Sequence, residues 1–241
     1  FFEGWYFKFV RANGETFAVI PGIFKAKSSA ADAHYNASSE AFIMVLDTHQ
    51  SHFYRFDVTQ FEAATGKFDV TLAGNRFTST SVKLDLTPGP RDDATLRDVA
   101  MHELIPWPVT LVNPGVMGWF AWLPRLQCYH GVLSMDHDIS GYLTINGSRV
   151  SLDGGRGYME KDWGRDFPKT WIWTQSHLAS ASGLCDSLCQ SAGRSASMFL
   201  SIANVPLYGY AIPGSHLPLQ QHRFPHWVST GERTVSICDI H

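Results

Sequence analysis

The sequence predicts an all-β protein made of two antiparallel β units. Short segments that alternate aromatic or branched residues with polar ones recur along most of the chain. Asn-Gly and Gly-rich turn signals separate many of these segments, as expected for strands joined by hairpins. A Pro-rich interruption divides the segments into two groups, which are arranged either as two open barrels or as one large sheet system.

The first unit, residues 1–105, is expected to start with a hairpin. Residues 1–10 alternate large aromatic side chains, Asn13-Gly14 is a turn signal, and residues 16–24 form the returning strand. Further strands are predicted at 41–47 and 53–58, followed by a meander of hairpins over 68–86. Residues 25–39 are rich in Ser and Ala and are expected to form a loop.

The second unit, residues 106–241, begins with an irregular apolar connection. Four prolines, at 106, 108, 114 and 124, punctuate this connection and argue against a helix. Asp136-His137-Asp138 is expected to form a turn between two of the following strands. Strands are predicted at 131–135, 141–145, 150–152, 157–163, 170–176 and 198–203. Residues 179–197 are predicted to form a long loop, and the pattern fades after Pro213, so the unit is expected to be incomplete at its C-terminus.

Composition limits the classes of function. The chain has 241 residues, 44% of them apolar, which is enough for one large β domain or two small ones. Aromatic residues make up 13% and charged residues 17%, which suits an aromatic-lined cavity as well as an ordinary β-rich protein. The net charge is −3 and there is no basic run, so we expect no nucleic-acid partner. No apolar run reaches the ~18 residues of a membrane span.

The cysteines and histidines do not predict a metal site. Cys128, Cys185, Cys189 and Cys238 have no matching His or Cys pair at zinc-ligand spacing, so free thiols are expected. The chain also starts without Met, in a segment that already reads as strand. We therefore expect the natural N-terminus, with any targeting peptide, to lie upstream.

The segment GRGYMEKDWG at 155–164 carries the strongest chemical signal. In a strand, Tyr158, Glu160 and Asp162 lie on one face because side chains alternate with period two. A carboxyl enclosed by aromatic rings is expected to have a raised pKa, and so to stay protonated near neutral pH as a general acid. The alternative is that both carboxylates pair with neighbouring Arg or Lys side chains, with Trp163 as a core residue.

Other candidate residues are aromatic, acidic or imidazole side chains on nearby strands. Trp171, Trp173 and Gln175 share one face of the next predicted strand, where indoles could stabilise a cation. His130 could orient an acid or accept a phenolic proton, although a lone histidine is more often structural.

The N-terminal strand offers a further candidate. Glu3 and Trp5 share a face of this strand, which fits either a pocket or an ion pair at a barrel end.

Four segments resemble the tocopherol cyclase family. They are FEGWYFK at 2–8, CYHGVLSMDH at 128–137, GGRGYMEKDWGRDFPKTWIWTQS at 154–176 and SMFLSIANVP at 197–206. The resemblance implies two tandem lipocalin-like antiparallel β-barrels. It also implies conversion of a phytyl-substituted benzoquinol into a chromanol, the ring-closing step of vitamin E synthesis, without a metal or redox cofactor.

A more distant similarity to carotenoid 1,2-hydratases supports the same residues. Those enzymes carry a Tyr-x-Asp pair in a comparable block, which corresponds to Tyr158 and Glu160 in this sequence. Both reactions start by protonating an alkene to give a tertiary cation, which an internal phenol oxygen or water then captures. The segment after Gln175 and the tail after about residue 223 depart from the family pattern.

The resemblance implies a mechanism and partners. Glu160 would donate the proton, with Asp162 as the alternative acid and Tyr158 as its hydrogen-bond partner or relay. The substrate would be bound by Glu3, Trp5, Trp163, Trp171, Trp173 and Gln175, and His130 or Glu3 would accept the phenolic proton. The expected partner is an apolar prenyl benzoquinol, with peripheral association at a membrane or lipid droplet. The family implies a plastid location in a photosynthetic host and a cytoplasmic one otherwise.

Two other functions stay open on the sequence. A non-catalytic lipocalin-like carrier would bind prenylquinones or lipids in an aromatic cavity, but it would gain nothing from buried acids. A terpenoid or carotenoid hydratase would use the same acids and admit water.

Overall fold

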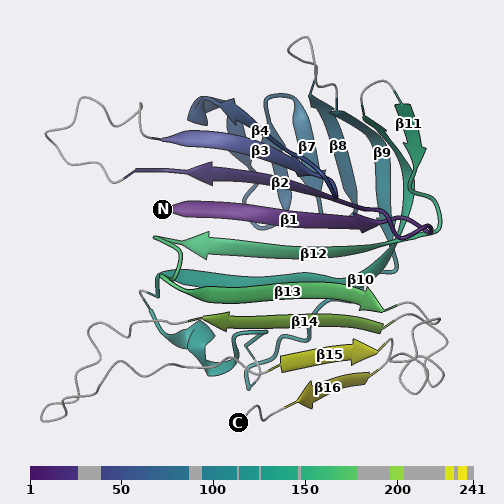
Figure 1. Ribbon diagram of the computed structural model, residues 1–241. Helices are drawn as coiled ribbons and strands as arrows, with labels where there is room; N and C mark the ends of the chain where they lie inside the picture. The colour runs from purple at the N-terminus through teal and green to yellow at the C-terminus, as the bar shows by residue number, and fades with distance from the viewer. Residues whose placement is uncertain are drawn as a thin grey trace, which may run out of the picture. The chain divides into compact units, whose positions relative to one another are not determined.

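The computed structural model describes most of residues 1–178 and three later strands. The described residues are 1–26, 39–86, 94–112, 114–124, 126–145, 148–178, 196–203, 226–230 and 233–237. Within these ranges the regular structure is β-strand, apart from the short 3-10 helices η1 (Val58–Gln60) and η2 (Gly118–Trp122). The all-β prediction is confirmed (Figure 1). In the same ranges, no helix has the length and apolarity needed to cross a membrane.

The chain forms two compact units that alternate along the sequence. The first unit contains residues 1–107 and 130–163, and the second contains residues 108–129 and 164–241. The sequence predicts two consecutive units, 1–105 and 106–241. In the structure, residues 130–163 belong to the first unit although they follow a segment of the second.

The first unit is built on one antiparallel sheet of 12 strands. Eleven of these follow the order β4-β3-β2-β1-β12-β10-β9-β8-β7-β6-β5, and β11 pairs with β10 beside this path. Strands β4 and β5 end the path, so the described sheet is open. The strands are β1 (Phe2–Val10), β2 (Thr16–Phe24), β3 (Glu40–Leu46), β4 (Ser51–Phe56), β5 (Phe61–Ala63), β6 (Asp69–Leu72), β7 (Asn75–Thr78), β8 (Ser81–Leu86), β9 (Ala94–His102), β10 (Cys128–Ile145), β11 (Ser148–Ser151) and β12 (Gly155–Gly164).

Strands from distant parts of the sequence meet at the centre of this sheet. Strands β12 and β10 lie between β1 and β9, so the N-terminal hairpin reaches the following meander only through later strands (Figure 1). The backbone groups of β1 are thereby paired on both sides, with β2 and with β12. This arrangement brings the acidic strand β12 beside the aromatic N-terminal strand.

The core of the first unit follows from the period-two alternation of its strands. On β1, Trp5, Phe7 and Phe9 are buried in the hydrophobic core, whereas the residues between them are half-buried. On β3, Ile43 and Val45 join the same core, and the residues between them again face the other side. One face of the β1–β3 sheet is therefore core, and the opposite face is partly exposed.

Two expectations about the middle of the chain are wrong. Asp136-His137-Asp138 is not a turn, because β10 runs without a break from Cys128 to Ile145, with a register shift between Ser140 and Tyr142. No strand was predicted between residues 86 and 106, where the structure has the full strand β9, which pairs with both β8 and β10. Charged residues had obscured the strand pattern in both places.

The second unit contains a four-stranded antiparallel sheet. Its order is β13-β14-β15-β16, with β13 at Trp171–Leu178, β14 at Ala196–Ala203, β15 at His226–Thr230 and β16 at Arg233–Ile237. The last two strands lie where the sequence pattern had faded. The loops expected at 25–39 and 179–197 lie almost entirely outside the described residues, as do Cys185, Cys189 and Cys238. Cys128 is half-buried, and its thiol donates to the Tyr129 carbonyl oxygen at 3.5 Å.

Candidate active site

Strand β12 presents a phenol and two carboxyls on the face opposite the core of the first unit. Met159 belongs to the hydrophobic core, so its neighbours Tyr158 and Glu160 point to the other side of the sheet. Asp162 follows with the same parity. The strand begins directly after Gly154, whose φ of +70° makes the turn that leads into it.

Tyr158 and Glu160 form a buried hydrogen-bonded pair. The Tyr158 hydroxyl donates to Glu160 Oε2 at 2.6 Å. Tyr158 is 0% exposed and Glu160 is 4% exposed. A carboxyl group so deeply buried needs hydrogen-bonding or charged partners, and Tyr158 supplies one of them.

His130, on the neighbouring strand β10, lies between the two carboxyls. Its Nδ1 is 2.6 Å from Asp162 Oδ1, and its Nε2 is 3.6 Å from Glu160 Oε2. Each ring nitrogen therefore faces a different carboxyl group. The four side chains form one chain of polar groups, Tyr158–Glu160–His130–Asp162, which we call the acid network.

The charges of the acid network raise the pKa of its imidazole. Burial by itself lowers the pKa of His130, but the charge of Glu160 and the hydrogen bond and charge of Asp162 outweigh it and raise the pKa to about 9. The imidazole therefore carries its second proton at neutral pH. Burial, followed by the charge of Glu160, raises the pKa of Tyr158 well above its usual value, so its hydroxyl stays protonated.

Two groups lie beside the Glu160 carboxyl, the Tyr158 hydroxyl and the His130 imidazole. Both the Tyr158 hydroxyl and the His130 imidazolium favour the charged form of a carboxyl group beside them. The available proton in the network is then held at His130 Nε2, next to Glu160. Arg156, the arginine nearest to Glu160 in the sequence, pairs with Asp136 and Asp138.

The same residues have the spacing of metal ligands. His130, Glu160 and Asp162 each offer one ligand atom, and these atoms lie within 4.8 Å of one another. Imidazole and carboxylate are ligands that suit zinc and other divalent transition metals. A cation bound here would displace the proton of His130, so metal binding and the protonated network exclude each other.

Tyr6 is a neighbour of this site that the sequence analysis did not select. Its ring packs edge-on against Tyr158 with centroids 6.3 Å apart. Burial, and then the charge of Glu160, raise the pKa of Tyr6 to about 12. The signal was present in the sequence, since Tyr6 has the opposite parity to Trp5 and Phe7 on β1.

Three predicted substrate-binding residues lie away from the acid network within the first unit. Glu3 forms an ion pair with Lys161, which has the opposite parity to Glu160. The Lys161 ammonium lies 5.1 Å from the ring centroid of Trp5 and 5.2 Å from that of Trp163. Trp5 is a core residue that stacks on Phe68 at 5.3 Å. These residues share the face that looks away from Glu160.

The other three predicted residues belong to the second unit. Trp171 is 54% exposed, Trp173 is half-buried, and Gln175 is buried and donates to Ser197 Oγ at 3.0 Å. All three lie on β13 with the same parity. Their role in substrate binding stays a prediction.

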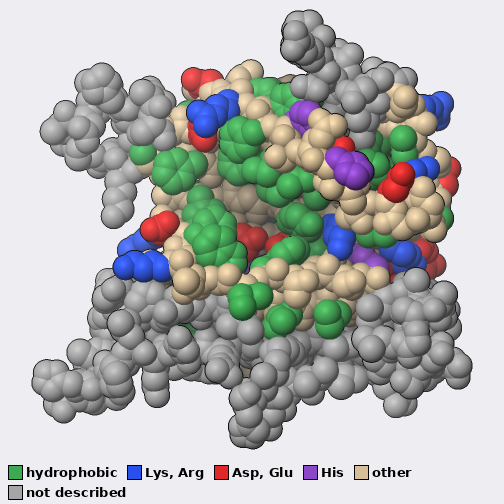
Figure 2. Space-filling model, in the orientation of Figure 1, with side chains coloured by type: hydrophobic (Ala, Val, Ile, Leu, Met, Phe, Trp, Pro, Cys, Tyr) green, Lys and Arg blue, Asp and Glu red, His purple; other side chains and the backbone are tan. Residues whose placement is uncertain are grey.

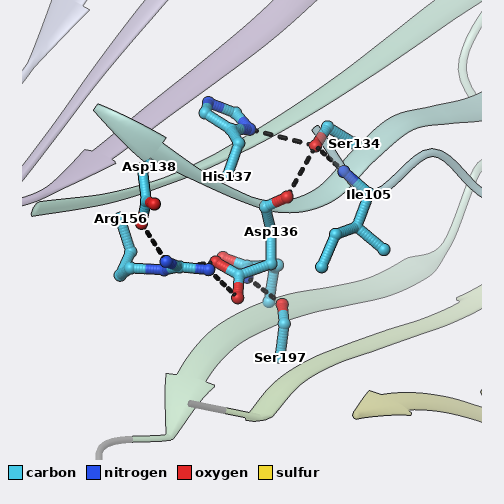
Figure 3. A network of polar contacts seen from close by, with 8 residues as sticks. Ile105, Ser134, Asp136, His137, Asp138, Arg156 and Ser197 are labelled. Atoms are coloured by element: carbon cyan, nitrogen blue, oxygen red, sulfur yellow. Dashed lines mark hydrogen bonds and ion pairs between the residues drawn. The ribbon is translucent and has the colours of Figure 1, made fainter. Parts of the chain in front are cut away.

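A partly buried ion network links β10 and β12 (Figure 3). Arg156 Nε donates to Asp136 Oδ1 at 2.8 Å, and the same guanidinium also pairs with Asp138. On β10, Ser134 Oγ donates to the Asp136 carbonyl at 2.9 Å and lies 3.0 Å from Nδ1 of the buried His137. Arg156, one of the possible partners of the acids, is thus engaged elsewhere.

Comparison with known proteins identifies the family. Residues 98–221 match the family described as "Tocopherol cyclase-like". The chain belongs to this family. The matched region contains β10 and β12, and with them all four residues of the acid network. The resemblance inferred from the sequence is confirmed.

Two curated plant proteins are similar over shorter segments. The chain is 30% identical over 76 residues to "Probable tocopherol cyclase, chloroplastic" of Oryza sativa subsp. japonica, which is 31% of this chain and 16% of that protein. It is also 30% identical over 67 residues to "Tocopherol cyclase, chloroplastic" of Zea mays, which is 27% of this chain and 14% of that protein. The matched segments thus span less than a fifth of either relative.

The solved structures that are similar to this chain share little sequence identity with it. A crystal structure assigned as AttH from Nitrosomonas europaea is 13% identical with a TM-score of 0.48, over 98% of this chain and 67% of that chain. Kievitone hydratase from Nectria haematococca is 13% identical with a TM-score of 0.42, over 98% of this chain and 63% of that chain.

Proposed function

We propose that this chain is a tocopherol cyclase-like enzyme that closes the chromanol ring of a prenyl benzoquinol. Membership of the family supports the reaction class. The observation that carries the proposal is the acid network, in which a buried carboxyl lies between a phenol and a protonated imidazole. Such a network can donate a proton to an apolar substrate and accept a proton from it later in the reaction.

The first step is protonation of the substrate. Glu160 takes the proton from His130 Nε2, 3.6 Å away, and delivers it to the prenyl-chain alkene nearest the quinol ring. A new carbon–hydrogen bond forms and leaves a tertiary carbocation. Tyr158 holds Glu160 in place, and the ring faces of Tyr158 and Tyr6 attract the cation.

The second step closes the ring and restores the enzyme. The quinol oxygen bonds to the cationic carbon, and its proton passes to His130, which is neutral after the first step. Asp162, hydrogen-bonded to Nδ1, keeps the ring oriented and stabilises its charge. The reaction is an isomerisation with no net gain or loss of protons, so the residues alone balance it.

The hydratase alternative shares the first step. It differs only in that water captures the cation, which would yield a tertiary alcohol. The carrier alternative requires no acid. In a carrier, a buried carboxyl would lower the stability of the fold and serve no catalytic purpose. The product of the reaction therefore separates the three functions.

The deciding experiment follows chromanol formation by chromatography from a phytyl benzoquinol. Wild-type protein is expected to form the chromanol, and Glu160→Gln is expected to lower the rate by about 100-fold or more because the proton donor is lost. Glu62→Gln is the matched control, since Glu62 is an exposed glutamate on β5. A tertiary alcohol would favour the hydratase, and binding without turnover would favour the carrier. Near-normal turnover by Glu160→Gln, with loss in Asp162→Asn, would transfer the acid role to Asp162.

A further inference from the structure

An apolar row of side chains extends from the acid network across four strands of the first unit. Ile20 on β2 is directly opposite Met44 on β3, and Met44 is opposite Phe53 on β4. Directly opposed residues share a face of an antiparallel sheet. Tyr6 on β1 lies at the inner end of this row, in contact with Tyr158.

A pair of glycines lets an aromatic ring lie flat beside this row. Gly4 and Gly22 are cross-strand partners, and Gly22 is in turn opposite Phe42. A Cβ atom at Gly22 would come within 2.5 Å of Phe42 Cζ, so the ring of Phe42 covers the glycine. Phe42 also stacks on Phe53, with ring centroids 5.2 Å apart. We call Tyr6, Ile20, Phe42, Met44 and Phe53 the tail surface.

The tail surface is more exposed than the core on the other side of the same strands. Ile43 and Val45, which alternate with Phe42 and Met44, are 0% and 3% exposed, whereas Phe53 is 44% exposed. Figure 2 shows hydrophobic side chains gathered over β1–β4, with acidic side chains visible beside them. Folding of the sheet alone does not require apolar residues on both faces of β3.

A polar boundary closes the outer end of the tail surface. Arg55 on β4 is opposite Phe42 and lies 3.5 Å from Glu40 in an exposed ion pair. The guanidinium also lies 5.5 Å from the ring centroid of Phe53. The surface thus runs from buried acids at β12 to a charged edge at β4, a span of roughly 19 Å for five neighbouring strands.

We propose that the tail surface binds the isoprenoid tail of the substrate while the quinol head lies at the acid network. This inference rests on the proposed function and assigns the part of the site that recognises chain length. The core of the first unit is filled by buried side chains such as Phe7, Phe9 and Phe77, which leaves the opposite face for the ligand. An isoprenoid tail fits the tail surface because that surface is apolar and begins beside the acid network.

The test is a binding experiment that needs no turnover. Benzoquinols with the same head group and short, intermediate or long prenyl tails are titrated into the full chain, and tryptophan fluorescence reports the affinity. Wild-type affinity is expected to rise with tail length. Met44→Gln and Phe53→Ser are each expected to lower affinity for the long-tailed ligand about tenfold, because apolar contact is lost. Affinity for the short-tailed ligand is expected to stay the same.

Controls separate this inference from the proposed function. Leu111→Gln removes an aliphatic side chain that is 89% exposed in the second unit, and it should leave tail-dependent binding intact. Glu160→Gln should slow ring closure by about 100-fold or more and keep the tail dependence of binding. Tail-dependent binding that is lost in Met44→Gln, in a protein that forms no chromanol, would support the tail surface and refute the cyclase.

Two results would overturn the inference. One is wild-type affinity for the long tail in both tail-surface variants, which would place the tail elsewhere. The other is a wild-type dimer that Met44→Gln converts into a monomer without altering tail affinity. In that case sedimentation velocity would identify the surface as a contact between two copies of the chain.

Discussion

At the residue scale, the proposed chemistry depends on a single imidazole between two carboxyls. His130 contacts Asp162 through one nitrogen and faces Glu160 with the other. The alternation of Tyr158, Glu160 and Asp162 on one face could be predicted from the strand period. The position of His130 could not, because it lies on another strand and reaches the acids only through sheet pairing.

The pH dependence of stability follows from His130. Its pKa is raised from 6.5 to about 9 in the folded state, so the charged imidazole stabilises the fold. This contribution, on the order of 3 kcal/mol, is fully present below pH 6.5 and is lost as the pH rises through about 9. Urea unfolding midpoints across this range are expected to fall with rising pH in the wild type.

Two histidine variants test whether His130 causes this fall of the unfolding midpoint with pH. His130→Gln is expected to remove most of the fall in midpoint, whereas His49→Gln, at an exposed turn, should reproduce the wild-type curve. A fall of equal size in His130→Gln would assign it to another titrating group. The rate of chromanol formation is expected to fall over the same pH range, because the proposed first step takes its proton from the charged imidazole.

At the element scale, β10 and β12 depend on close contact across the sheet. Gly157 on β12 faces His137 on β10, and a Cβ atom there would lie 2.5 Å from Cδ2 of that ring. His137 is fully buried and is held at Ser134, so the ring has little room to move. The glycine that looks like part of a flexible turn in the sequence is therefore a packing requirement.

Substitution of Gly157 tests this contact. Gly157→Ala is expected to destabilise the protein by about 1–3 kcal/mol through overpacking, measured as a lower thermal midpoint. Gly131→Ala is the control, because a Cβ atom at that position would meet Trp163 Cζ3 at an ordinary 3.5 Å. Equal midpoints for the two variants would show that His137 can shift without cost.

Arg156 explains why β10 continues through a segment that resembles a turn. Asp136 is 3% exposed, and its charge is balanced by the Arg156 guanidinium from β12. Two aspartates close together in the sequence favour a turn. The residue that stabilises Asp136 within a strand, Arg156, lies 20 residues away and does not enter such a local prediction. The missed strand β9 likewise pairs on one side with a distant strand, β10, and on the other with the preceding strand β8.

Removal of the guanidinium should therefore be costly. Arg156→Met is expected to destabilise the protein by about 3–5 kcal/mol, because it leaves a buried carboxylate without its partner. Arg55→Met breaks an exposed ion pair, in which the Arg55 side chain is 74% exposed, and should change stability by less than about 0.5 kcal/mol. Chemical denaturation of both variants provides the measurement, and similar losses would contradict the assignment.

At the scale of the whole molecule, the first unit is assembled from two separated stretches of chain. Strands β12 and β10 separate β1 from β9, although β1 and β9 both come from the first 107 residues. A fragment with residues 1–105 would therefore lack the two central strands. The edges of β1 and β9 would be left unpaired, which favours aggregation over folding.

Expression of that fragment tests the division of the chain. Residues 1–105 are expected to show no cooperative thermal unfolding, whereas the full chain is expected to unfold cooperatively. A soluble fragment with a sharp transition would instead support two consecutive domains.

The sequence by itself determined the all-β class, the N-terminal hairpin and the shared face of Tyr158, Glu160 and Asp162. These features depend on neighbouring residues, through the period of two and through turn signals such as Asn13-Gly14. Tertiary structure alone decided that His130 joins the acids, that Trp5 and Trp163 face away from them, and that β12 lies beside β1. Strand order and register place those groups, and both depend on hydrogen bonds between residues far apart in the chain.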